Sequence, residues 1–245
     1  MNIELNCDLG EGYSLYKMGD DAAIMPMIDL ANIACGFHAS DPPTMARTVA
    51  LAKQYGKKVG AHPSLPDRDG FGRREMKIPR DELASILVYQ IGALKGFLEA
   101  ENLPLNHIKP HGVLYGMAAR DEAVAHAICD AAKVFNVPVF GMSGTLHESV
   151  FAMRGVALIG EFFADLEYDA TGSLLITKEH PPYDEERAVR RVQRALETGQ
   201  IESVDGSATL PVRFGTICLH SDTPNAVAVV GRVAEFLAAW RSRSA

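Results

Sequence analysis

The sequence has no long apolar run, no basic leader and no paired cysteines. No segment approaches the roughly 18 consecutive apolar residues that a membrane span needs. The first residues, MNIELNCD, lack a basic start followed by an apolar core, so no signal peptide is predicted. The four cysteines (Cys7, Cys35, Cys129 and Cys218) are far apart and form no C-x-x-C pair. These absences predict a cytoplasmic protein with reduced thiols and no membrane contact.

Familiar signatures of nucleotide binding and acyl transfer are also missing. The chain contains no Gly-Lys-Ser/Thr phosphate loop, so any nucleotide must be held in another way. It contains no G-x-S-x-G nucleophile elbow either. The net charge is −7 and the isoelectric point is near 5.6, which leaves no basic footprint for nucleic acid.

Short apolar runs alternate with helical segments along all 245 residues, which contain 47% hydrophobic and 22% charged residues. This composition is typical of a folded core and excludes a disordered chain. With no repeat or linker-like shift in composition, we expect one domain over residues 1–245. The expected strands are residues 3–9, 30–34, 58–61, 107–109, 138–141, 157–163 and 216–219. The clearest expected helix carries Leu83, Leu87, Ile91, Leu94 and Leu98, three to four residues apart.

Repeated strand–helix alternation predicts a parallel sheet with right-handed crossovers. Nearly every expected strand is followed by an ionisable or metal-capable residue. A closed barrel brings all of its carboxyl-terminal loops to one mouth, whereas an open sheet concentrates its site at one or two loops. The sequence therefore favours an α/β fold built as a (β/α) barrel.

Four of the eight histidines (His38, His62, His111 and His220) directly follow expected strands. One such residue is usually structural, but four in equivalent positions indicate a site, because folding alone gives no reason for the pattern. His126, His147 and His180 are interpreted instead as surface or packing residues.

Asp8 and Glu11 bring two carboxylates to the same expected mouth. They can divide the roles of general base and orienting group if their environments differ, although turn formation is the simpler explanation. Asp8, His38 and His62 together could also form a two-His, one-carboxylate site for a divalent metal. No local motif such as H-E-x-x-H supports that metal site.

Two further segments offer cations for an anionic ligand. Arg68 and Arg73 lie in a loop rich in glycine and proline, and they could clamp a carboxylate or phosphate; a solvated loop is the alternative. Lys109 and His111 follow a strand, where a buried lysine is costly unless it meets an anion. The long connection over 161–184 has no helical period and is either a lid over the mouth or a small hairpin through 174–177.

Several motifs together resemble the LamB/YcsF family, which supplies one component, designated A, of bacterial ATP-dependent 5-oxoprolinase. They are NCDLGE at 6–11, ANIACGFH at 31–38, GAHPS at 60–64, PDR at 66–68, FGR at 71–73, YQIGAL at 89–94, KPHG at 109–112 followed by LY at 114–115, FAD at 163–165 and CLH at 218–220. The motifs span the chain in order.

The resemblance implies a distorted seven-stranded barrel related to the glycoside hydrolase/deacetylase superfamily. It also implies that the chain acts with two further subunits (B and C) to open 5-oxoproline to L-glutamate, with ATP as co-substrate. A lactam amide is a poor electrophile, and phosphorylation of its oxygen would turn that oxygen into a leaving group.

This chemistry assigns expected roles to the candidate residues. The expected catalytic set is Asp8, Glu11, His38, His62, Lys109 and His111, and the expected substrate- or phosphate-binding set is Asn6, Arg68, Arg73, Asp165 and His220.

The chain departs from the family pattern at Ser40, Leu166 and Ser221. These positions lie near the expected mouth, so a related lactam is an open alternative. Two other functions also stay open: a stand-alone metal-dependent deacetylase or amidase, and a non-catalytic ligand-binding subunit. Self-association is neither required nor excluded by the modest acidity.

Overall fold

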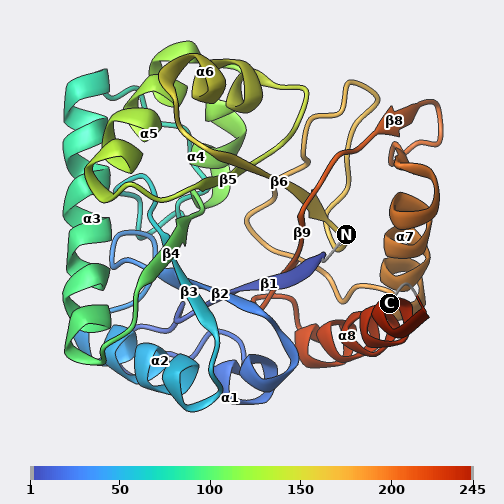
Figure 1. Ribbon diagram of the computed structural model, residues 1–245, viewed down its shortest axis with the longest axis horizontal. Coiled ribbons are helices and arrows are strands. Elements are labelled where there is room, and N and C mark those ends of the chain that lie inside the picture. Colours follow the sequence, from blue (N-terminus) through green and yellow to red (C-terminus); the bar gives the residue numbers. More distant parts are fainter. Residues whose placement is uncertain (1–2, 244–245) are drawn as a thin grey trace.

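The seven expected strands close into a parallel barrel in the computed structural model, which describes residues 3–243 (Figure 1). The prediction of an α/β barrel is therefore confirmed. In order around the barrel, the strands are β1 (Glu4–Leu9), β2 (Leu30–Ala34), β3 (Lys58–His62), β4 (Leu105–Ile108), β5 (Val139–Gly141), β6 (Leu158–Phe163) and β9 (Thr216–His220).

The register of β1 explains how the barrel closes. Asp8 lies opposite Asn32 on β2 and opposite His220 on β9, so the first and last barrel strands are neighbours. The seam between β4 and β5 is the weakest, with Ile108 and Val139 as its paired residues. Such uneven pairing gives the distorted barrel that the family resemblance implies.

A short antiparallel hairpin, β7 (Gln200–Glu202) and β8 (Thr209–Pro211), lies between β6 and β9 in sequence and outside the barrel. The sequence does not predict it, because strands of three residues are too short to show a period. The helices and one 3₁₀ turn are α1 (Asp21–Ile24), η1 (Met25–Met27), α2 (Pro42–Gln54), α3 (Arg80–Ala100), α4 (Gly112–Ala118), α5 (Glu122–Phe135), α6 (Leu146–Arg154), α7 (Glu185–Thr198) and α8 (Ala226–Arg243).

The helices surround the strands, as Figure 1 shows. Helix α3 is the one described helix long and apolar enough to cross a membrane. Its buried face includes Leu87, Ile91 and Leu94, and the helix packs against α5, α2 and β3. Burial of that face inside the protein accounts for its apolar composition.

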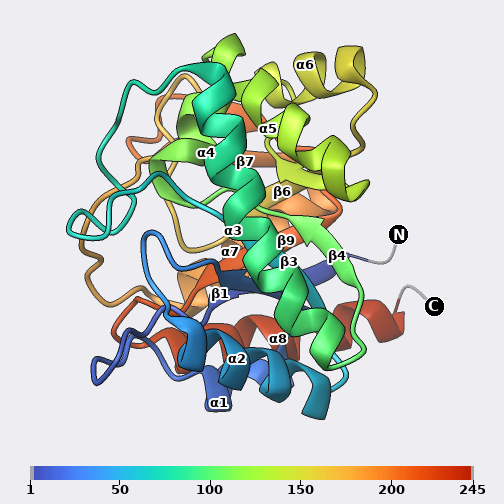
Figure 2. The same ribbon diagram turned by 90° about the vertical axis from the view of Figure 1, so that its left-hand side faces the viewer.

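The loops that follow the carboxyl ends of the strands gather at one end of the barrel. Figure 2 shows the loops over residues 10–20, 63–79 and 164–184 on the side of the molecule opposite the two chain ends. Parallel strands make this inevitable, because every strand ends at the same rim.

Residues 164–184, which we call the covering segment, contribute to this rim. A bridge between Tyr168 and Leu174 closes its first turn, and no strand forms over 174–177. Arg191 on α7 donates to the Leu166 carbonyl at 2.6 Å and to Glu167 Oε2 at 2.6 Å. The segment is therefore anchored to α7, and the expected small hairpin through 174–177 is wrong.

Candidate functional site

The barrel interior is polar because polar side chains alternate with apolar ones along its strands. Asn6 donates to Thr216 Oγ1 at 2.8 Å, and Asn32 donates to Asn6 Oδ1 at 2.8 Å and to Asp8 Oδ1 at 2.7 Å. His107 Nε2 lies 2.7 Å from Asn32 Oδ1. This chain of amides fixes Asp8 from below, since each buried polar group needs a partner.

Gly60 makes room for that network. A Cβ atom at Gly60 would lie 2.0 Å from Nε2 of His107. Only glycine at this position of β3 lets the imidazole lie across the barrel. The ring also stacks on Phe140, with centroids 3.9 Å apart.

Lys109 follows β4 and reaches into a cluster of acids. Its Nζ lies 2.7 Å from Asp8 Oδ1, 3.4 Å from Glu161 Oε1 and 2.8 Å from Cys218 Sγ. All of these side chains are buried. Burial alone would lower the pKa of Lys109, but the carboxylate of Asp8 outweighs it and holds the pKa well above the usual value. The ammonium is therefore a permanent charge.

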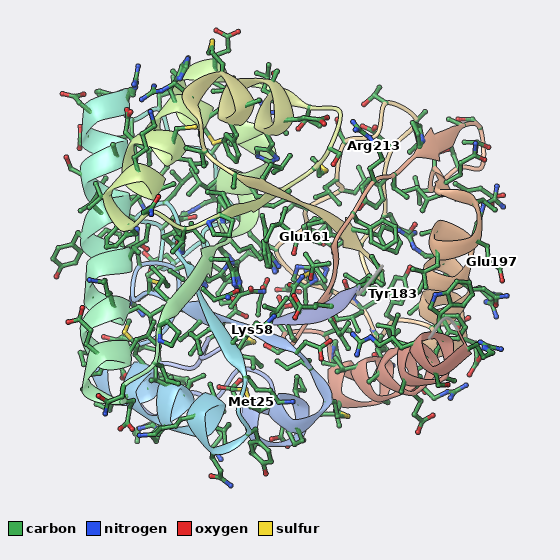
Figure 3. All side chains as sticks on the ribbon, in the orientation of Figure 1. Met25, Lys58, Glu161, Tyr183, Glu197 and Arg213 are labelled. Carbon is green, nitrogen blue, oxygen red and sulfur yellow. The ribbon has the colours of Figure 1, made fainter. Side chains whose placement is uncertain are left out.

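The acids around Lys109 differ in protonation. Burial would raise the pKa of Asp8, but the charges of His62 and Lys109 outweigh it and hold that pKa well below its usual range. Burial raises the pKa of Glu161, because Lys109 compensates only in part. Neither oxygen of Glu161 has a hydrogen-bond partner among residues 3–243. Glu161 lies in the middle of the molecule in Figure 3, whereas Glu197 is on its outer edge.

Three histidines and Glu11 form a second group beside Asp8. His38 Nε2 lies 3.0 Å from Glu11 Oε1, and His62 Nε2 lies 2.9 Å from His111 Nδ1. The rings of His38 and His111 stack with centroids 3.6 Å apart. Burial lowers the pKa of His38 and His111 well below the usual value, and it raises the pKa of Glu11. His62 links this group to Asp8, because its Nε2 is 3.2 Å from Asp8 Oδ2.

His220 is held by a carboxylate in the manner of a catalytic dyad. Its Nδ1 lies 2.9 Å from Asp165 Oδ1, and its backbone N–H donates to Asp165 Oδ2 at 2.7 Å. Its Nε2 lies 3.6 Å from Asp8 Oδ2. Burial would lower the pKa of His220, but the Asp165 carboxylate outweighs it and raises the pKa above 6.5. An imidazole oriented in this way can exchange protons near neutral pH.

Arg73 completes the rim. Its Nη2 pairs with Asp222 Oδ2 at 2.8 Å, and its Nη1 donates to the carbonyl of Lys178 at 2.9 Å. His180 Nε2 lies 3.8 Å from Asp222 Oδ2. The covering segment therefore meets the barrel mouth through Arg73.

A small cavity lies between these groups. It measures about 20 Å³, which is room for about one water molecule. Asp8, His62, Lys109, His111 and His220 line its floor, and the covering segment closes it with Leu166, Leu174, Ile176 and His180. Because so small a space cannot hold a substrate, the covering segment must move for one to enter.

The structure brings most of the predicted site residues together at this cavity. The residues that meet there or contact those that do are Asn6, Asp8, Glu11, His38, His62, Arg73, Lys109, His111, Asp165 and His220. Arg68 does not join them: its guanidinium lies over the Tyr13 ring at 4.1 Å and donates to the carbonyls of Gly36 and Ser40. The loop turns Arg68 outward, so half of the expected anion clamp is absent.

Five residues of the site were not predicted from the sequence. These are Asn32, His107, Glu161, His180 and Asp222. Asn32 and Glu161 left a usable signal, because a polar residue inside an apolar parallel strand is costly unless it has a purpose. His180 was interpreted as a surface or packing residue, and that interpretation is wrong because its ring lines the cavity.

Two sets of side chains have ligand atoms close enough to hold one metal ion. The first contains Glu11, His38, His62 and His111, and the second contains Asp8, Cys218 and His220. The expected set of Asp8, His38 and His62 is therefore not the one that the structure gathers. Asp8 is drawn away from it by Lys109 and Asn32.

Comparison with known proteins gives consistent matches over the whole chain. The model of the LamB/YcsF family matches residues 3–244. The lactam utilization protein lamB of Emericella nidulans is 45% identical over 229 residues, which cover 92% of this chain and 90% of that relative. A 5-oxoprolinase component of Thermus thermophilus, its first subunit by name, is 42% identical over 241 residues, covering 97% and 96% of the two chains. The crystal structure of a lactam utilization protein from Thermus thermophilus matches with a TM-score of 0.88, 40% identity and 98% coverage of each chain.

Proposed function

Because this chain belongs to the LamB/YcsF family, we propose that it is one subunit of a lactam hydrolase that opens 5-oxoproline to L-glutamate. ATP is hydrolysed to ADP and phosphate in the reaction, and two further subunits take part. The names of its relatives support this proposal, since they are a lactam utilization protein and a subunit of 5-oxoprolinase. A nucleotide site is assigned to the partner subunits, in keeping with the lack of a phosphate-loop motif.

The observation that carries the proposal is the buried ammonium of Lys109 on the cavity floor, next to two proton-exchanging groups. Opening a lactam requires water to bond to the carbonyl carbon, the C–N bond to break and the ring nitrogen to gain a proton. Negative charge builds up on the carbonyl oxygen, or on a phosphoryl group bonded to it, during the attack. Lys109 stabilises that charge, because a fixed cation in a dry site acts strongly.

His220 moves the protons in this proposal. Asp165 holds the proton on Nδ1, so Nε2 faces Asp8 and the cavity as the basic nitrogen. It takes a proton from the attacking water and delivers it to the ring nitrogen, as one imidazole can do in both directions. Asp8 stays ionised and holds Lys109 in place.

Arg73 binds the carboxylate of the lactam. Its guanidinium is already aligned by Asp222 at the rim, and the planar fork suits a carboxylate. The covering segment then closes over the bound lactam and excludes bulk water. A five-membered lactam with one carboxylate is small enough for such a closed site.

The test is the formation of glutamate and ADP from 5-oxoproline and ATP by the purified chain, alone and with the two candidate partners. The proposal expects turnover only in the complete assembly, and loss of turnover when Lys109→Ala replaces the wild-type chain. Amide hydrolysis by the isolated chain without ATP would replace the proposal with a metal-dependent amidase, which the histidine-rich mouth favours as the second candidate. Full turnover by an assembly that carries Lys109→Ala would indicate a non-catalytic subunit.

A further inference from the structure

The four side chains Glu11, His38, His62 and His111 contain a contact between two nitrogen lone pairs. His62 Nδ1 lies 2.7 Å from the carbonyl of Lys109, and His111 Nε2 lies 2.7 Å from the carbonyl of Phe71. A carbonyl only accepts, so each of these two nitrogens carries the ring proton. The other two nitrogens, His62 Nε2 and His111 Nδ1, are bare in the neutral rings, and they face each other at 2.9 Å.

Carboxylate oxygens surround the same point. Glu11 Oε1 lies 3.6 Å from His111 Nδ1, and Asp8 Oδ2 lies 3.2 Å from His62 Nε2. Facing acceptors repel one another unless a cation or a proton lies between them. Lone pairs of four residues therefore converge on one buried region.

His38 adds a further independent feature. Its Nδ1 is buried and has no hydrogen-bond partner within residues 3–243, while its Nε2 faces Glu11 Oε1 at 3.0 Å. Buried imidazole nitrogens are normally paired, so an unpaired one calls for a ligand or a partner. This nitrogen belongs to the same group of ligand-capable side chains.

The separations within the group suit a transition metal. Zinc–nitrogen and zinc–oxygen bonds of about 2.0 to 2.1 Å in a tetrahedron place ligand atoms about 3.3 Å apart. The separations that join Glu11, His38, His62 and His111 are 2.9, 3.0 and 3.6 Å. Little movement is needed to bind an ion.

The charge of the site points the same way. Five buried or nearly buried carboxyl groups face the cavity or its neighbours: Asp8, Glu11, Glu161, Asp165 and Asp222. The permanent cations among them are Lys109 and Arg73. A divalent ion would balance much of the excess negative charge.

We propose that Glu11, His38, His62 and His111 bind one divalent transition-metal ion of the zinc type. Three imidazoles and one carboxylate are ligands that such ions prefer over magnesium or calcium. The neighbouring set of Asp8, Cys218 and His220 does not take this role, because the Lys109 ammonium already lies between Asp8 and Cys218. This site goes beyond the proposed lactam chemistry and is measured without it.

The experiment uses the purified full chain, stripped with a chelator and titrated with cobalt(II) chloride and with zinc chloride. The proposal expects one equivalent of cobalt, with visible absorption bands of low symmetry and no thiolate charge-transfer band. His111→Gln and His38→Gln should each weaken cobalt binding at least about 100-fold, and Cys218→Ser should leave it unchanged. His147→Gln is the matched control, since His147 is also a buried histidine with an unpaired Nε2 but lies outside the group.

Circular dichroism confirms that each variant is folded before titration. No cobalt or zinc binding by the folded wild-type chain would overturn the proposal, and so would equal binding by His111→Gln and wild type. Loss of binding in Cys218→Ser would place the ion in the neighbouring set and overturn it as well. None of these results decides whether the assembled enzyme opens lactams, so the two proposals fail separately.

Discussion

The Lys109 ammonium lies 2.7 Å from Asp8 Oδ1 at the floor of the barrel mouth, and both side chains are almost fully shielded from solvent. Asn32 holds the same oxygen from below at 2.7 Å. The pair joins strands that are far apart in sequence, so it links the chemistry of the site to the stability of the barrel.

Replacing Lys109 with methionine should reduce the free energy of unfolding by about 3 to 5 kcal/mol, because Asp8 is left as a buried charge without its partner. Urea denaturation followed by circular dichroism measures this loss. The double variant Asp8→Asn with Lys109→Met should recover part of it, since neither charge then remains. Additive losses in the double variant would show that the two charges do not interact.

Replacing Asp165 with asparagine should move the acidic limb of the pH–rate profile of the assembled enzyme to lower pH. The Asp165 carboxylate raises the pKa of His220, so its removal lets that pKa fall. His220 then stays in its basic form at a lower pH, although turnover itself falls at least about 10-fold as the ring loses its orientation. Asp130→Asn is the matched control, because Asp130 pairs with Arg80 and Arg154 away from the cavity. An unmoved acidic limb in Asp165→Asn would remove His220 from the proton transfer.

Replacing Gly60 with alanine should destabilise the protein by at least about 1 to 3 kcal/mol, since the new methyl group overlaps the His107 ring. The ring must then leave Asn32, which orients Asp8. Gly92→Ala in α3 is the matched control, because no atom lies within 4 Å of a Cβ at that position. That control should gain up to about 1 kcal/mol from higher helix propensity. Thermal unfolding of both variants checks the pair, and equal effects would contradict the packing argument.

Replacing Arg191 with methionine should loosen the covering segment. Arg191 holds the Leu166 carbonyl and Glu167, so its loss frees the first turn of the segment. Limited proteolysis within residues 164–184 should become several-fold faster, and the KM of the assembled enzyme should rise more than kcat falls. Arg194→Met tests specificity, since Arg194 lies on the same helix and pairs with Glu202 in an exposed position. Equal cleavage rates in wild type and Arg191→Met would contradict the anchoring role.

Much of the barrel could be predicted from sequence because its signals are local. A buried parallel strand is a short apolar run, and a covering helix repeats its apolar residues every three or four positions. Both patterns are read within a window of about 20 residues. The hairpin of β7 and β8 escaped prediction because three residues cannot display a period.

The sequence also placed Asp8, His62 and Lys109 at one mouth, since all strand ends of a parallel barrel meet there. It could not tell which way a loop residue turns. Arg68 and Arg73 are equivalent in the sequence pattern, yet Arg68 stacks on Tyr13 outside and Arg73 pairs with Asp222 at the rim.

By itself, then, the sequence determined the barrel, its order of strands and the family, because these follow from local patterns repeated along the chain. Tertiary structure alone decided which side chains touch: Lys109 with Asp8, His220 with Asp165, and His62 with His111. The partners in these pairs are separated by roughly 50 to 100 residues of chain, so no local pattern encodes their contact. Their distances and protonation depend on burial and on neighbouring charges, which exist only after the strands have closed.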